Sequence, residues 1–311
     1  MPGVSREIAL LVNPTAGRGR AARAADPVAD GLRAAGLAVR EIRVPDPAAA
    51  LRMLRSEVRS GVGAVVAVGG DGTVSLALQA VAGTGVPLGI VAIGSGNDFA
   101  RSVGLPVGDL DAAIPVIAAG RTRTLDLGRA EDRWFGTVIA SGFDSRVNER
   151  ANAMTWPRGR MRYNRAVVAE LPALKPVPYE LELDGRTVEV EAMLVAVGNG
   201  TSYGGGMKIC PDADMTDGMF QITVVGACGR FELLRVLPRA YSGRHVDHPA
   251  VTTYSASVVA LSAPKVTAWA DGERIAPLPL TATTVPGALR LLAPVLPAPR
   301  ENVITSQDAA R

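Results

Sequence analysis

The order of apolar segments in the first 130 residues constrains the fold most strongly. Apolar runs typical of buried strands alternate with segments of helical periodicity, beginning with a strand at residues 6–14 and a helix that ends near Gly36. The alternation continues to a strand at residues 122–130. Because strands that alternate with helices pair in parallel and are covered by helices on both faces, we predict an α/β domain built on a parallel sheet.

The pattern changes near Arg129. Short segments that alternate polar and apolar residues follow, and Asp184-Gly185 lies between two of them, as in a tight hairpin turn. Helical periodicity returns near residues 163–174 and 230–243. We therefore predict a second, mostly antiparallel β domain after the first.

Length and composition agree with two domains. The chain has 311 residues, of which 48% are hydrophobic, and this exceeds what one compact domain usually needs. A net charge of +3 with 20% charged residues argues against a disordered chain and against a strongly basic nucleic-acid-binding protein, while favouring anionic partners. The predicted domains are residues 1–128 and 129–296, and residues 297–311, which have no apolar pattern, form a loose tail.

The expected cellular setting is cytoplasmic. Two cysteines, Cys210 and Cys228, cannot make a disulfide framework, which favours a reducing environment. The N-terminus has no apolar stretch of signal-peptide length, and no run reaches the roughly 18 apolar residues needed to cross a bilayer. Contact with a membrane is therefore expected from the aqueous side only.

The segment VAVGGDGTVSLALQA leaves a predicted strand through three glycines and an aspartate. Gly69, Gly70 and Gly72 would allow the backbone to approach a polyphosphate closely. Asp71 would repel a phosphate unless Mg²⁺ lies between them, so its presence favours bound Mg²⁺. Thr73 can cap the next helix or donate to a phosphate. The alternative is a tight strand-to-helix turn in which Asp71 and Thr73 act as caps.

A similar corner comes first in the chain, in VNPTAGRGRAARAA. A strand ends at Asn13-Pro14, and Gly17 and Gly19 lead into a helix whose free amides would bind an anion. The glycine spacing also satisfies a dinucleotide-binding pattern, with Glu41 at about the expected distance. An NAD-dependent oxidoreductase is therefore an alternative interpretation.

The third corner is VAIGSGNDFARSVGL, in which Ser95 lies between two glycines and Asn97 and Asp98 open a predicted helix. The carboxyl ends of parallel strands meet at one edge of a sheet, so the three corners are expected to gather there. The sequence has no Walker A lysine motif. It therefore predicts a nucleotide site that is not of the P-loop kind.

Together, NPTAG, GGDGT and GSGNDFAR resemble, in this order, the diacylglycerol kinase and sphingosine kinase catalytic family. These lipid kinases are related in their first domain to phosphofructokinases and NAD kinases, and NAD kinases are not expected to carry the first and third motifs together. The resemblance runs from about Ile8 to Pro294. It implies an α/β nucleotide-binding domain followed by a β-sandwich domain, with ATP and a lipid meeting in the cleft between them.

The resemblance also implies roles for single residues. Asp71 would organise catalytic Mg²⁺ through water, and Glu273 in WADGERI would be the general base for the lipid hydroxyl. Without the resemblance, Asp271-Gly272 reads as a plain hairpin turn. Ser95 stands where the family usually has threonine. The implied nucleotide-binding residues are Asn13, Pro14, Thr15, Ala16, Gly17, Gly69, Gly70, Asp71, Gly72, Thr73, Ser95, Asn97 and Asp98.

A structural Mg²⁺ site is implied in CPDADMTDGMFQ. Asp217 would bind the ion together with the backbone carbonyls of Asp214 and Met219, since oxygen ligands suit a hard cation. The alternative is an acidic surface loop. The sequence departs from the family at Ser75-Leu76, where an asparagine and a glutamate are common. This departure raises the alternative of a non-catalytic protein that binds lipid or membrane surfaces.

Two further features of the sequence, a pair of histidines and a basic, aromatic segment, each have two interpretations. His245 and His248 could present two imidazoles, but Pro249 favours a solvated polar turn over a metal site. Basic and aromatic residues also gather in one segment, which could rest on anionic headgroups or form a solvated helix face. Its members are Trp156, Arg158, Arg160, Arg162, Tyr163 and Arg165.

The predicted reaction is phosphoryl transfer from Mg·ATP to the hydroxyl of a diacylglycerol-like or sphingoid-like lipid. The protein is expected at the inner face of the membrane as a peripheral enzyme, without a transmembrane segment and without nucleic acid as a partner. The oligomeric state stays open, a homodimer included.

Overall fold

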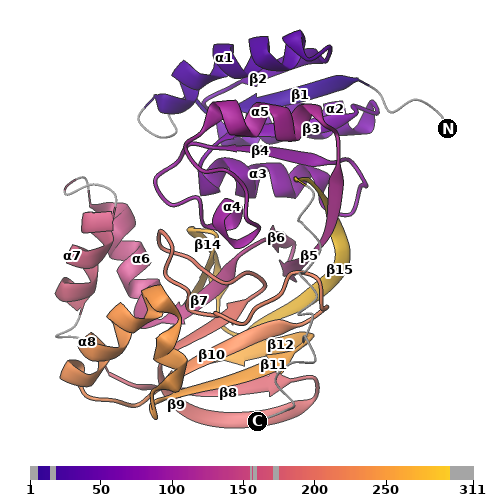
Figure 1. The fold of residues 1–311 in the computed structure, drawn as a ribbon. Helices are drawn as coiled ribbons and strands as arrows, with labels where there is room; N and C mark the ends of the chain where they lie inside the picture. Colours follow the sequence, from indigo (N-terminus) through magenta and orange to yellow (C-terminus); the bar gives the residue numbers. More distant parts are fainter. Residues whose placement is uncertain (1–5, 15–18, 155, 157–159, 171–174, 295–311) are drawn as a thin grey trace, which may run out of the picture.

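One mixed sheet of fifteen strands runs through the computed structural model of the chain (Figure 1). The structure describes residues 6–14, 19–154, 156, 160–170 and 175–294. The expectations for Thr15, Ala16, Gly17 and the tail at 297–311 therefore lie outside the described residues.

The first half is a layered α/β unit, as predicted. Its parallel strands follow the order β4-β3-β1-β2, and helices cover both faces. The strands are β1 (Glu7–Val12), β2 (Ala38–Arg43), β3 (Ala64–Gly69) and β4 (Leu88–Ala92). The helices are α1 (Arg20–Ala34), α2 (Pro47–Arg59), α3 (Asp71–Val81), α4 (Asp98–Ser102) and α5 (Leu110–Ala118).

The burial of β1 explains why this half is layered. Ile8 and Leu10 pack with α1 and α5, whereas Ala9 and Leu11 pack with α2 and α3, because successive side chains of a strand point to opposite faces. All six residues of β3 are buried. Such continuous apolar strands are typical of parallel sheets covered on both sides.

The second half is a mostly antiparallel β-sandwich unit, which confirms the predicted fold class. Asp184 and Gly185 have φ angles of 48° and 84° and join two antiparallel strands, as the sequence indicates. The strands are β5 (Thr122–Ala130), β6 (Arg133–Phe135), β7 (Val138–Gly142), β8 (Val177–Leu183), β9 (Arg186–Gly198), β10 (Phe220–Gly226), β11 (Val251–Ala256), β12 (Val258–Ser262), β13 (Thr267–Ala270), β14 (Glu273–Pro277) and β15 (Leu280–Leu292).

Three helices pack together on one side of these strands (Figure 1). They are α6 (Phe143–Ala153), α7 (Arg160–Glu170) and α8 (Arg230–Arg239), and the short 3-10 turns η3 (Ala240–Ser242) and η4 (Arg244–Asp247) follow α8. Among the described residues, none of the helices is both long and apolar enough to span a bilayer.

Strand β15 connects the two halves. It pairs antiparallel with β5 and β12, and near its end Leu291 pairs in parallel with Leu88 of β4. Pro286-Gly287 lies within this strand, and the pairing register shifts there, between Val285 and Leu289.

The interpretation of His245 as part of a solvated turn is wrong. Its side chain is fully buried, and its ring nitrogen Nε2 lies 3.0 Å from the backbone oxygen of Ile209. Pro249 follows this short 3-10 turn, but the His245 side chain in the turn is buried in the core. Burial lowers the pKa of His245 below its ordinary value of 6.5.

This burial predicts a pH dependence of stability. The unfolded chain binds a proton at His245 more readily than the folded chain, so the free energy of unfolding should fall as the pH drops from about 7 toward 5. His245→Asn should make the dependence less steep. Urea unfolding at a series of pH values measures this, and equal slopes for wild type and His245→Asn would contradict it.

Candidate active site

The second and third glycine corners meet at one edge of the sheet. Strands β3 and β4 are neighbours, with Gly69 paired to Ala92, so their carboxyl ends lie side by side. The backbones approach so closely that a Cβ atom on Gly70 would lie 2.9 Å from Cα of Gly94. Only glycine fits at these positions, which explains the composition of both corners.

Asp71 links the two corners through its carboxylate. It accepts hydrogen bonds from the backbone N–H of Asn97 at 2.7 Å and of Asp98 at 2.6 Å. The carboxylate thus caps the first turn of α4, where free amides favour a negative charge. Burial raises the pKa of Asp71, and the backbone hydrogen bonds oppose this rise.

Asp98 connects this edge of the sheet to the second half of the chain. Its carboxylate accepts hydrogen bonds from the backbone N–H of Gly205 at 2.8 Å and of Gly206 at 2.6 Å. Both glycines have positive φ angles, 87° and 98°, which side chains rarely allow. Burial, and then the negative charge of Asp71, raise the pKa of Asp98 to about 6.

Asn97 hydrogen-bonds to the backbone of the third corner through its side chain. Asn97 is buried, its Oδ1 accepts from the N–H of Gly94 at 2.8 Å, and its Nδ2 donates to the Gly94 oxygen at 3.0 Å. Thr73 is also buried, whereas Ser95 is exposed. Ser95 is therefore the side chain of this group that is open to a ligand from solvent.

The first corner lies next to the third. Arg20, the first residue of α1, donates from Nη2 to the backbone oxygen of Gly94 at 3.2 Å. Asn13 and Pro14 follow β1 directly and are partly buried. The described parts of all three corners therefore gather at the carboxyl edge of the parallel sheet, as their position after the strands predicts.

The Asp271-Gly272 hairpin joins β13 to β14 and brings the second half to the same place. Asp271 accepts hydrogen bonds from the backbone N–H of Gly136 and of Thr137, each at 2.9 Å. Burial raises the pKa of Asp271, and the negative charge of Asp71 adds to the rise. Phe99 of α4 lies against Gly136, whose N–H donates to Asp271, so the hairpin and the third corner are held close together. Asp271 lies in a hairpin turn, as the sequence alone indicates. Its carboxylate also binds this hairpin to Gly136 and Thr137, the two residues between β6 and β7.

Glu273 is the first residue of β14. Its Oε2 accepts from Nη2 of Arg133 at 2.6 Å, and 45% of its side chain is exposed. The carboxylate is therefore accessible from solvent and held in place by a cation. Arg133 did not stand out in the sequence, because it precedes an ordinary short strand.

In the loop predicted to bind a structural metal ion, two carboxylates accept hydrogen bonds from backbone N–H groups of the same loop. Asp214 accepts from the N–H of Thr216 at 2.9 Å, and Asp217 accepts from the N–H of Met219 at 2.8 Å. Both aspartates line a cavity of about 330 Å³ together with Asp212. Within the described parts of the chain, no group of three or more His, Cys, Asp or Glu side chains is placed to hold a metal ion. The predicted donor set, one carboxylate and two carbonyls, is of another kind and stays a prediction.

Asp126 is an anchor that sequence reasoning missed. It is buried, and its two carboxylate oxygens accept from the backbone N–H of Gly218 at 2.8 Å and of Gly287 at 2.7 Å. One side chain on β5 thus fixes both the loop before β10 and the register shift of β15. An aspartate inside an apolar strand was the signal that could have indicated it.

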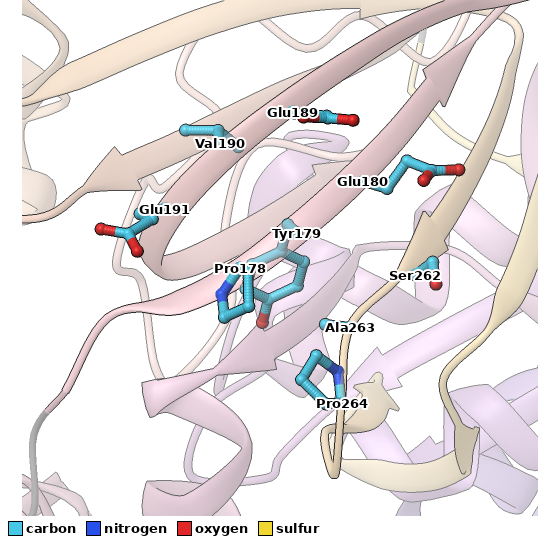
Figure 2. A pocket seen from close by; sticks show the side chains of 9 residues that line it. All are labelled: Pro178, Tyr179, Glu180, Glu189, Val190, Glu191, Ser262, Ala263 and Pro264. Carbon is cyan, nitrogen blue, oxygen red and sulfur yellow. The ribbon is translucent and has the colours of Figure 1, made fainter.

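An open groove of about 670 Å³ is lined by residues of β8 and β9 and by the residues at the end of β12. Figure 2 shows its lining, in which Glu180, Glu189 and Glu191 surround Pro178 and Tyr179. None of the predicted site residues lines this groove. The candidate site is therefore the meeting point of the corners and the hairpin.

Comparisons with known proteins decide which family builds such a site. A curated relative from Mycobacterium tuberculosis strain H37Rv, called diacylglycerol kinase, is 45% identical over 93% of this chain and 95% of its own length. The chain belongs to the diacylglycerol kinase family. The family description "Diacylglycerol kinase catalytic domain" matches residues 7–130, and "YegS C-terminal NAD kinase beta sandwich-like domain" matches residues 137–293.

A solved structure supports the fold assigned to this family member. The crystal structure of a diacylglycerol kinase from Bacillus anthracis strain Sterne is 21% identical and covers 93% of this chain and 97% of its own, with a TM-score of 0.73. As a diacylglycerol kinase family member, the chain is an enzyme, a lipid kinase, and its family implies the use of a nucleotide.

Two sequence features pointed to alternatives to a kinase: the dinucleotide pattern with Glu41, and the departure at Ser75-Leu76. Glu41, which the dinucleotide pattern would place on a ribose, forms surface ion pairs with Arg33 and Arg43, and the family assignment favours a kinase over an oxidoreductase. Ser75 is buried, and Leu76 packs against the core. The departure from the family pattern thus lies on a buried part of α3.

Proposed function

We propose that the protein transfers the γ-phosphoryl group of Mg·ATP to the hydroxyl of a lipid, diacylglycerol-like or sphingoid-like, at the inner face of the membrane. The observation that carries the proposal is a chain of contacts from the corners to the hairpin that leads to Glu273. Asp71 accepts from the N–H of Asp98, the neighbouring Phe99 lies against Gly136, and the N–H of Gly136 donates to Asp271. These contacts support a phosphate-type site close to the exposed carboxylate of Glu273.

A divalent cation could be held at this site through water. Within the described residues, Asp71, Asp98 and Asp271 are not placed to ligate an ion directly, but burial and then the charge of Asp71 raise the pKa of Asp98 and of Asp271. A cation nearby would offset this negative charge. Asp71 would hold Mg²⁺ through water, and the ion would neutralise charge on the phosphates. Asp217, with the carbonyls of Asp214 and Met219, would hold a second, structural ion.

The residues of this chain would mainly position the reactants. The glycine corners at residues 69–73 and 94–96, together with Asn13, would line the triphosphate, and the exposed Ser95 would donate a hydrogen bond to it. The N–H groups of Asn97 and Asp98 stay bound to Asp71. Glu273 would accept the proton of the lipid hydroxyl. The hydroxyl oxygen then bonds to the γ-phosphorus, the bond from that phosphorus to the β,γ-bridging oxygen breaks, and ADP leaves.

Glu273→Gln tests the general base. We expect kcat to fall by about 10²- to 10⁴-fold, because the amide cannot take the proton, while the affinity for ATP stays within about threefold. Arg274→Gln, at the next and exposed position of β14, is the matched control and should keep the wild-type rate. A Glu273→Gln enzyme that turns over as fast as wild type would remove this residue from the mechanism.

Isothermal titration calorimetry tests the nucleotide. Titration with ATP and Mg²⁺ should release or absorb heat with a single binding step, and titration with NAD should give none at equal concentration. Because Asp71 lies at the proposed phosphate site, Asp71→Asn should weaken the ATP signal. Tight binding of NAD without binding of ATP would favour the oxidoreductase instead.

A further inference from the structure

The outer face of helix α7 presents large apolar side chains to solvent. Met161 and Val168 are 68% and 63% exposed, and Trp156, just before the helix, is 71% exposed. Met161, Arg165 and Val168 follow the spacing i, i+4, i+7, so they lie on one face of the helix. Trp156, Met161, Arg165 and Val168 are called the α7 face below.

The exposed side chains of the α7 face do not belong to the hydrophobic core. The opposite side of α7 is already packed, since Ala166 is fully buried and Val167 lies against the apolar cluster that α6 and α8 share. Glu170, also on the inner side, is paired with Arg150 of α6. The helix is thus apolar on two faces, and only the inner one is covered by the described chain. Of the five exposed large apolar side chains among the described residues, the three most exposed belong to the α7 face.

The positive charge of residues 156–169 indicates which kind of partner the α7 face binds. Residues 156–169 contain four arginines and no acidic residue, whereas the whole chain has a net charge of only +3. The guanidinium of Arg165 lies 5.5 Å from the centre of the Trp156 ring, so a positive charge is held directly beside the apolar side chains. Apolar residues combined with arginines are complementary to the headgroup region of an anionic bilayer.

A second copy of the chain fits this surface less well. Joining two α7 faces would bring the Arg165 side chains of two copies together, in a segment (residues 156–169) that has no acidic residue to pair with them, and like charges oppose such an interface. The position of the helix also suits a lipid. Helix α6 packs against α7 and contacts β13, the strand that leads into the hairpin before Glu273.

We propose that the α7 face docks the enzyme on an anionic lipid surface. Trp156, Met161 and Val168 enter the headgroup region, and Arg165 lies against lipid phosphates. The inference rests on the proposed function, because it names the surface from which that site would take its lipid. Docking is nevertheless measured separately from phosphoryl transfer.

Vesicle sedimentation tests the docking. Wild-type protein should bind vesicles of phosphatidylcholine with phosphatidylglycerol and should bind much less to phosphatidylcholine alone. The double variant Met161→Ser, Val168→Ser should weaken binding to the anionic vesicles about tenfold, and Arg165→Gln about fivefold at low salt. The matched controls are Met53→Ser and Arg52→Gln, an exposed methionine and arginine on α2, which should bind as wild type does.

Tryptophan fluorescence locates the contact. Brominated lipids in the anionic vesicles should quench part of the wild-type emission, and this part should disappear in Trp156→Phe. Equal quenching in both proteins, or equal vesicle binding by the double variant and wild type, would overturn the proposal. So would light scattering that shows a dimer in wild type and a monomer in the double variant.

Two further measurements separate this proposal from the proposed function. Asp71→Asn should bind anionic vesicles as wild type does, although it should not turn over lipid. The double variant should phosphorylate a short-chain lipid dissolved as monomers at the wild-type rate, yet lose most of its rate on vesicles. If wild type binds vesicles through the α7 face but phosphorylates no lipid, docking stands and the kinase proposal fails. If the double variant loses its rate on both forms of lipid, the α7 face acts within the site and the docking proposal fails.

Discussion

Asp71→Asn is expected to lower the rate of lipid phosphorylation by about 10³-fold or more while the protein stays folded. The substitution removes the negative charge that would organise Mg²⁺, at the point where the two glycine corners meet. One side-chain oxygen is kept and can still accept from the N–H of Asp98. The amide nitrogen faces the N–H of Asn97, which loses its acceptor, so we expect the free energy of unfolding to fall by about 1–3 kcal/mol. Initial rates with labelled ATP and lipid vesicles, beside a thermal unfolding curve, measure both effects.

The matched control is Asp46→Asn. Asp46 also caps a helix with its carboxylate, since it accepts from the N–H of Ala48 at 3.1 Å and of Ala49 at 3.2 Å at the start of α2. It is exposed and follows the edge strand β2, two strands from β3. Asp46→Asn should therefore keep the wild-type rate. A rate for Asp71→Asn within about threefold of wild type would contradict the role of Asp71 as more than a cap.

Asp126→Ala is expected to lower the free energy of unfolding by about 3 kcal/mol or more. The alanine would leave the N–H groups of Gly218 and Gly287 without their acceptor in a buried place, and each such loss costs about 1–3 kcal/mol. Asp126→Asn, which keeps one acceptor oxygen, should lose less. The midpoint and slope of urea unfolding give these values.

Asp184→Ala provides the comparison for this loss. Asp184 also accepts from two backbone N–H groups, those of Ser257 and Val258, but at an exposed hairpin where water can replace it. Its loss should cost less than about 1 kcal/mol. If Asp126→Ala costs no more than Asp184→Ala, then burial does not set the value of the Asp126 anchor.

The sequence indicated the parts of the fold that depend on local pattern. The buried strand β3 and the glycine corner after it could be predicted, because a parallel strand covered on both sides must be apolar throughout. The Asp184-Gly185 hairpin was predictable for a similar reason, since few residue pairs adopt two positive φ angles in succession.

Helix α6 was missed because its sequence, FDSRVNERANA, has few apolar residues to give a period. It is held through Phe143, Val147 and Ala151, which are four residues apart and all buried. His245 was placed in solvent for a related reason, because a local turn signal does not tell whether the turn faces the core. Both errors arise where tertiary packing, and not the local pattern, decides the outcome.

The contacts between residues far apart along the chain could not be predicted. Asp98 meets Gly205 and Gly206 from more than one hundred positions away along the chain, and Asp126 meets Gly287 from still farther. Each of these bonds goes to a backbone N–H, which carries no sequence signal of its own. The three successive glycines at 204–206 were the one local hint that backbone is approached there.

Incubation of the wild-type protein with ATP labelled at the γ-phosphate, Mg²⁺ and a total lipid extract tests the central claim most directly. Mass spectrometry of the products should show label on a lipid that has gained one phosphate at a former hydroxyl, and the Asp71→Asn reaction should show none. The account would be contradicted if no lipid acquires the label, or if Asp71→Asn transfers it as fast as wild type.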